Sequence, residues 1–99
     1  MKFFLHPQAQ KELEQTILFY KKQQAGLEKR FIEAVEAVED AINRVCRNPL
    51  LYRKIDVAVR KCRLLHFPNA IIFRTEPAQL EIIAVMHLRK QPNYWQSRK

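Results

Sequence analysis

The chain has 99 residues, of which 47% are apolar and only one is glycine, a composition typical of one small globular domain. Its 18 basic and 10 acidic residues give a formal net charge of +8, which argues against an acidic-tail protein and favours an anionic partner. No segment approaches the roughly 20 apolar residues of a membrane-spanning helix, and the N-terminus lacks the pattern of a signal peptide. We therefore expect a single domain over residues 1–99 that acts in the cytoplasm without a membrane.

The positive charge is confined to the second half of the chain. Residues 1–43 carry six basic and seven acidic residues, a balance of −1. Residues 44–99 carry twelve basic and three acidic residues, a balance of +9. Such asymmetry in a small domain favours an electrostatic binding surface over an ordinary solvated face.

The N-terminal segment predicts a strand followed by a helix. Residues 2–5 form a short apolar run, and Pro7 fits the first turn of a helix, where its missing N–H has no cost. Apolar residues then recur at helical spacing from residue 9 to 20. Gly26, the only glycine, stands where a helix C-terminus favours a left-handed residue.

A second helix follows directly. Its apolar stripe runs from Leu27 to Val45 and includes Phe31 and Val38. Asn48-Pro49 ends it, because the residue before proline is disfavoured in the α region. The short link between the two helices predicts an antiparallel hairpin.

After Pro49 the apolar period changes from helical to alternating. Residues 55–64 alternate imperfectly, which predicts one strand with a bulge near Lys61. Residues 70–74 and 80–88 predict two further strands joined by a short loop. The resulting order, βααβββ, indicates an α+β domain with the helical hairpin packed on a mainly antiparallel sheet.

The last predicted strand is apolar on both faces. Strict alternation places Ile82, Ala84 and Met86 on one face, and Ile83 and Val85 on the other. A strand of this kind is central in its sheet and is covered on both sides, either within the domain or once a partner binds. The tail that follows it is polar and aromatic, without a clear period.

Nothing in the sequence predicts a cofactor. The two cysteines, Cys46 and Cys62, lack the spacing of a zinc or redox pair, and we expect free thiols. No set of histidines, cysteines and carboxylates has the spacing of a metal site. We expect neither a metal nor another cofactor.

A set of short segments, spread over nearly the whole chain, has a specific order and spacing. The segments are Phe4–Leu13, Phe19-Tyr20, Leu27 with Phe31, Asn48-Pro49 with Tyr52, Val59–Pro68, Ile71–Arg74 and Ile83–Trp95. Together they resemble the RelE/ParE superfamily of bacterial toxins from type II toxin–antitoxin systems. The resemblance implies a toxin that arrests growth, contributes to plasmid stabilisation and is neutralised by a cognate antitoxin, which we expect to be acidic and partly disordered.

The two branches of this superfamily imply different activities. ParE-like members poison DNA gyrase by binding it, without a known hydrolytic reaction. His87 followed by Arg89-Lys90 stands where ParE-like members carry a His-x-x-Arg pattern after the last strand. The resemblance therefore favours the ParE-like branch and a binding activity over an enzymatic one.

The RelE-like branch, ribosome-dependent mRNA endonucleases, is the alternative. Arg60 and Arg63 would hold the scissile phosphate, His87 or His66 would move a proton, and Arg89 would stabilise developing charge. On a regular strand, however, Arg60 and Arg63 point to opposite faces of the sheet, and only a bulge would bring them together.

A basic nucleic-acid-binding module without a toxic role is the second alternative. In each case the expected contacts to the target or the antitoxin come from the basic second half and its tail: Arg60, Lys61, Arg63, Arg89, Lys90, Tyr94 and Trp95. Tyr94 and Trp95 either stack on a base or fold back over the open face of the sheet. We favour folding back, because an aromatic pair buries a large apolar area.

Overall fold

A computed structural model of the chain describes the backbone of residues 1–22 and 28–99 and the side chains of residues 1–22 and 32–99. Gly26, Leu27 and the side chain of Phe31 lie outside the described residues. The elements follow in the order β1 (Lys2–Leu5), α1 (Pro7–Lys21), α2 (Glu28–Arg47), η1 (Pro49–Leu51), β2 (Arg53–Asp56), β3 (Val59–Arg63), β4 (Asn69–Thr75), β5 (Gln79–His87) and η2 (Gln96–Arg98).

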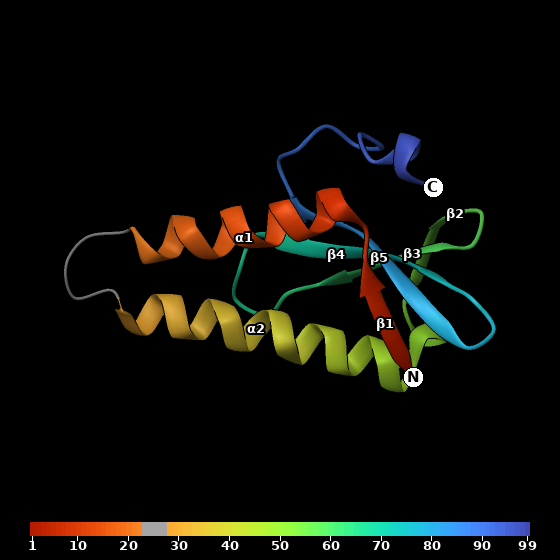
Figure 1. The fold of residues 1–99 in the computed structure, drawn as a ribbon, viewed down its shortest axis with the longest axis horizontal. Helices are drawn as coiled ribbons and strands as arrows, with labels where there is room; N and C mark the ends of the chain where they lie inside the picture. Colours follow the sequence, from red (N-terminus) through yellow and green to blue (C-terminus); the bar gives the residue numbers. More distant parts are fainter. Residues whose placement is uncertain (23–27) are drawn as a thin grey trace.

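The predicted first strand and both predicted helices are confirmed. Pro7 occupies the first turn of α1, and the Nδ1 atom of His6 caps this helix by accepting the backbone N–H of Gln8 at 3.1 Å. Asn48 and Pro49 follow the last residue of α2. The two helices run side by side in opposite directions and cover one face of the sheet (Figure 1).

Five strands form one sheet in the order β1-β5-β4-β3-β2. β1 pairs in parallel with β5, whereas all other neighbours are antiparallel. The predicted α+β class, with a helical hairpin on a mainly antiparallel sheet, is therefore confirmed. β5 is an inner strand, as its apolar residues on both faces predict.

The single strand predicted over residues 55–64 is wrong, because a tight turn at Val57-Ala58 divides it into β2 and β3. Asp56 pairs with Val59 across the turn, and its Oδ1 accepts the backbone N–H of Val57 at 2.7 Å. Ala58 has a φ of 58°, a left-handed conformation that usually selects glycine or asparagine. The observed order is therefore βααββββ.

No bulge lies at Lys61 itself, because β3 pairs with β4 without interruption. The nearest irregularity is in β2, where Lys54 pairs with Arg60 and Asp56 with Val59, so that Ile55 has no partner. A further bulge lies in β5, where Ile72 pairs with Ala84 and Phe73 with Ile82, so that Ile83 has no partner. Because of this extra residue, the predicted assignment of β5 side chains to the two faces is wrong. Ile82 and Val85 face the helices, while Ile83, Ala84 and Met86 face the other side.

The sheet therefore has an apolar core on each face. The helix-side core is the larger and contains Ala9, Tyr20, Ala34, Val38, Ala41, Val45, Cys62, Leu64, Phe67, Ile71, Phe73, Leu80, Ile82 and Val85. The core on the opposite face contains Val59, Ala70, Ile72, Ile83, Ala84, Met86 and Trp95. No helix of the hairpin lies on that second face. The C-terminal tail covers it instead, with Trp95 packed in the second core.

Candidate functional site

The three basic residues predicted on one strand do not share a face. Regular alternation along β3 places Lys61 and Arg63 with Val59, opposite the helices, and Arg60 with Cys62, on the helix side. The guanidinium of Arg60 donates to the backbone carbonyl of Tyr52 at 2.9 Å. Arg60 and Arg63 therefore do not act as a pair.

His87 is the last residue of β5, Arg89 and Lys90 lie in the turn that follows it, and all three are exposed. The Nδ1 atom of His87 accepts the backbone N–H of Arg89 at 3.0 Å, and its carbonyl accepts the backbone N–H of Lys90 at 2.9 Å. His87 thus shapes the turn that presents the two cations. His87 faces the helix side, whereas Arg63 faces the opposite side, so the structure does not assemble the phosphate and proton-transfer set of the nuclease hypothesis.

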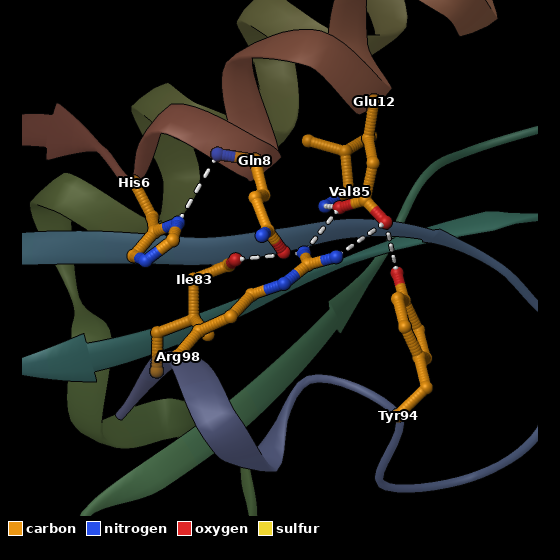
Figure 2. Close-up of polar contacts among 7 residues, drawn as sticks. All are labelled: His6, Gln8, Glu12, Ile83, Val85, Tyr94 and Arg98. Atoms are coloured by element: carbon orange, nitrogen blue, oxygen red, sulfur yellow. Dashed lines mark hydrogen bonds and ion pairs between the residues drawn. The ribbon is translucent and has the colours of Figure 1, made fainter.

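The C-terminal tail is fastened to α1 by a carboxylate that the sequence did not single out. Glu12 accepts hydrogen bonds from the Tyr94 hydroxyl at 2.6 Å and from Arg98 at 2.7 and 3.2 Å (Figure 2). Its Oε1 also accepts the backbone N–H of Val85 at 3.1 Å. The guanidinium carbon of Arg98 lies 5.0 Å from the centre of the Tyr94 ring, within cation–π range.

These contacts satisfy the part of β5 that has no strand beside it. β1 pairs with β5 only as far as Ile82, and in the described part of the chain no strand continues that edge. Beyond this point, Glu12 accepts a hydrogen bond from the backbone N–H of Val85, and Arg98 donates one to the carbonyl of Ile83 at 3.2 Å (Figure 2). Side chains therefore replace a strand at the bulge, where buried backbone groups need partners.

The other end of the tail is fastened to β2. Asp56 accepts hydrogen bonds from Lys99 at 2.7 Å and from Gln96 at 2.9 Å. The hydrogen bond from Lys99, followed by those from Gln96 and from the backbone N–H of Val57, holds the pKa of Asp56 well below its usual value of 3.8. Glu12 and Asp56 thus hold the tail from α1 and from the edge strand.

Between these two attachments, Trp95 is 1% exposed and packs in the second core. The folded-back position predicted for the two tail aromatics is the one observed, and the Trp95 ring is not at the surface to stack on a base. Tyr94 is half-buried, and its burial, followed by the hydrogen bond to Glu12, raises the pKa of its hydroxyl. Tyr94 therefore stays a protonated donor to Glu12 at neutral pH.

A cleft of about 580 Å³ opens between α1 and the start of the tail. We call it the α1–tail cleft; its lining residues include Thr16, Phe19, Asn69, His87, Lys90 and Tyr94. It is the place where two of the predicted binding cations, Arg89 and Lys90, meet an apolar surface. Sequence reasoning did not find Glu12, Asp56, Asn69 or Arg98, because each has the local pattern of an ordinary surface residue.

Among the residues that the structure describes, we find neither an activated thiol nor a metal site. Cys46 and Cys62 are free, and burial raises the pKa of both thiols, so neither is an activated nucleophile. Among the residues that the structure describes, no group of three or more histidines, cysteines and carboxylates is placed to hold a metal ion. In the same part of the chain, no helix has the length and apolar character needed to cross a membrane.

The fold is similar to that of a solved structure. A chain from the chromosomal ParDE toxin–antitoxin system of P. aeruginosa superposes with a TM-score of 0.72 at 18% sequence identity. The match covers 88% of this chain and 95% of that one. No curated protein matches the sequence.

The sequence itself defines the family. Residues 3–92 match the family model of the ParE toxin of the type II toxin–antitoxin system parDE. The chain belongs to the ParE toxin family. It is the toxin component of a type II toxin–antitoxin system, as its resemblance predicts, and a cognate antitoxin is its partner. This membership decides against a nucleic-acid-binding module without a toxic role.

Glu12→Gln should release the tail. The substitution removes the charge opposite Arg98, whose side chain is only 9% exposed, and we expect a loss of about 3 kcal/mol in the free energy of unfolding. Trp95, the only tryptophan, should shift its fluorescence to longer wavelength as its cover loosens. Urea denaturation followed by Trp95 emission measures both effects.

Glu14→Gln is the matched control, because Glu14 lies on the same helix, is exposed and accepts a hydrogen bond from its neighbour Gln10. It should change the free energy of unfolding by less than about 0.5 kcal/mol. Equal effects of the two substitutions would contradict the role assigned to Glu12.

The Asp56 attachment should weaken in acid. The pKa of Asp56 is lower in the folded protein than its usual 3.8, so its contribution to stability is present above that value and is lost as the pH falls towards the folded pKa. The difference in unfolding free energy between the wild type and Asp56→Asn should be constant above about pH 5 and should shrink below about pH 4. Urea titrations at a series of pH values test this, and a difference independent of pH would contradict it.

Proposed function

We propose that this toxin arrests growth by binding DNA gyrase in the cytoplasm, and not by cleaving mRNA on the ribosome. The chain acts in this proposal as one toxin domain spanning residues 1–99. Family membership supports the ParE-like branch, and the structure offers a physical reason to prefer a binding activity.

The observation that carries the proposal is the covered sheet face. Opposite the helices, Ile72, Ala84 and Met86 lie beneath Trp95 in an apolar core. A nuclease that uses a sheet face as its active site needs exposed polar groups there to hold a phosphate and transfer protons. An apolar face closed by a tryptophan supplies neither.

The positions of the candidate catalytic residues support the same conclusion. Arg60 and His87 are on the helix side at opposite ends of the sheet, since Arg60 aligns with Phe73 and His87 with Asn69 on β4. Arg63 is on the other face. General acid–base catalysis requires groups within about 3 Å of the reacting atoms, and these three cannot surround one phosphate.

The purified toxin should inhibit DNA supercoiling by gyrase and should leave mRNA on translating ribosomes intact. His87→Gln should alter toxicity only through the turn or through binding, because His87 accepts the N–H of Arg89 and has no reacting partner in this proposal. Supercoiling gels measure the first activity, and mapping of 5′ ends on a ribosome-bound message measures the second. Codon-positioned cuts that disappear in a folded His87→Gln protein would sink the proposal and establish the endonuclease.

The antitoxin is proposed to be acidic and partly disordered before it binds. The +9 balance of residues 44–99 favours an acidic partner, and a segment that folds on binding can wrap around a small toxin. The exposed cations Arg63 and Arg89, with half-buried Arg60, would steer its approach.

Replacing Arg60, Arg63 and Arg89 together with glutamine should slow association with the antitoxin by about tenfold at low salt, with little change in dissociation. Raising the salt concentration to physiological strength should slow wild-type association in the same direction. Stopped-flow kinetics with the antitoxin encoded beside this gene measures both rates. Lys2, Lys11 and Lys22 replaced together with glutamine carry the same charge change in the first half, and an equal slowing would show that the second half is not the docking surface.

A further inference from the structure

Three cations gather on the sheet face opposite the helices. Arg53 on β2 pairs directly with Lys61 on β3, and Arg63 stands two residues further along β3 on the same face. This is the face of the second core, because Lys61 aligns on β4 with Ile72, a residue of that core. The side chains of Arg53 and Arg63 are exposed and that of Lys61 is half-buried. We call these three residues the β2–β3 cation patch.

The patch holds like charges close together without a counter-charge. Residues directly opposite on antiparallel strands have Cβ atoms about 5 Å apart, and like charges in such a pair are destabilising. Within the described part of the chain, no carboxylate forms an ion pair with any of the three cations. The carboxylate of β2 itself, Asp56, is already engaged by Lys99. The three charges therefore stay available to an external anion.

Protection of the sheet edge explains only part of this charge. β2 is the edge strand on the side of the sheet away from β1, and cations on an edge strand oppose pairing with another chain (Figure 1). This role fits Arg53 and its neighbour Lys54. It does not fit Lys61, which lies on an inner strand between β2 and β4. A second cation directly opposite Arg53 has a cost in stability that binding of an anion would offset.

The surroundings of the patch favour the backbone of a nucleic-acid duplex as that anion. Ala70 and Ile72, beside it on β4, are fully buried, so this strand offers no exposed apolar anchor of the kind on which protein interfaces are centred. The exposed aromatic residues of the described chain lie on β1 and α1, namely Phe3, Phe4 and Phe19, so none is placed to stack on an unpaired base. Duplex DNA carries one negative charge per roughly 1.7 Å of its axis and keeps its bases stacked inside.

We propose that the β2–β3 cation patch binds the phosphate backbone of duplex DNA without regard to base sequence. The patch contains neither a histidine nor a carboxylate, so it holds phosphate without a group to move a proton. This inference rests on the proposed function for the source of the duplex, because gyrase acts on double-stranded DNA. The toxin then contacts both the enzyme and the DNA that the enzyme holds. The test below uses no gyrase, so a failure of DNA binding and a failure of the supercoiling experiment are distinguishable.

The experiment measures binding of the toxin, free of antitoxin, to a fluorescent 20-base-pair DNA duplex by anisotropy at a series of salt concentrations. Each phosphate contact contributes about −0.9 to the slope of log K against log salt concentration, so the patch predicts a slope of about −2.7. Arg53→Gln combined with Lys61→Gln should bring the slope to about −0.9 and weaken binding at low salt by at least about tenfold. Lys2→Gln combined with Lys11→Gln is the matched control, because it makes the same charge change at exposed positions on β1 and α1. The control should keep the wild-type slope.

The stability of the free toxin separates a binding role of Lys61 from a structural one. Because Lys61 opposes Arg53, Lys61→Gln should weaken DNA binding while it leaves the unfolding midpoint unchanged or raises it. Weaker binding accompanied by a lower midpoint would mean that Lys61 acts through the fold, against the proposal. If the double variant does not fold, Arg63→Gln decides alone, with an expected slope of about −1.8.

Two competitors test the kind of anion. An unlabelled duplex should displace the labelled one at a lower concentration, in moles of negative charge, than either polyglutamate or a single-stranded DNA 20-mer. Displacement by polyglutamate or the single strand at an equal or lower concentration would overturn the proposal in favour of an acidic protein or an unpaired strand. The proposal is also overturned if the double variant binds the duplex within about twofold of the wild type, or no more weakly than the control pair.

Discussion

The carboxylate of Glu12 is the interaction on which the arrangement of this toxin depends. One side chain on α1 satisfies a backbone N–H of β5, a tyrosine hydroxyl and an arginine, all contributed by segments more than seventy residues away in sequence. Hydrogen bonds to a charged acceptor in a half-buried site are individually stronger than those between neutral groups. Without this carboxylate, Arg98 would be a largely buried cation without its counter-charge, and the N–H of Val85 would lose its partner.

The role of Glu12 is linked to the bulge at Ile83. An extra residue in β5 turns Ile83 and Ala84 to the same face, which enlarges the apolar area opposite the helices. That area must be covered in a chain of only 99 residues, and the tail is the segment that covers it. The bulge creates the surface that Trp95 fills, and Glu12 and Asp56 hold Trp95 in place.

Much of this fold follows from the sequence, because periodicity is a local signal. The helical spacing of the first half, the Pro7 start and the apolar character of the last strand on both faces all led to elements that the structure contains. The turn at Val57-Ala58 could not be predicted, since both residue types favour strand or helix and Ala58 adopts a left-handed conformation against its intrinsic preference. The β5 bulge has no glycine or other local mark, and only the register with β4 and the division of residues between the two cores reveal it. The partners of Glu12 could not be predicted either, because the pairing joins distant segments.

The same contacts determine which cations of the basic second half are available to a partner. Of its cations, Arg98 and Lys99 are tied to Glu12 and Asp56, Arg74 is paired with Glu81, and Arg60 donates to a backbone carbonyl. Asp56 and Glu81 are already counted in the formal balance of +9, but the pairs of Arg98 with Glu12 and of Arg44 with Asp40 use carboxylates of the first half and lower the charge available to a partner below that balance. Exposed charge remains at Arg47, Arg53, Lys54 and Arg63 and in the turn at Arg89 and Lys90. Since the tail that follows this turn is fixed by Glu12, the contact that closes the second sheet face also helps to place the charges of Arg89 and Lys90 at the rim of the cleft beside α1.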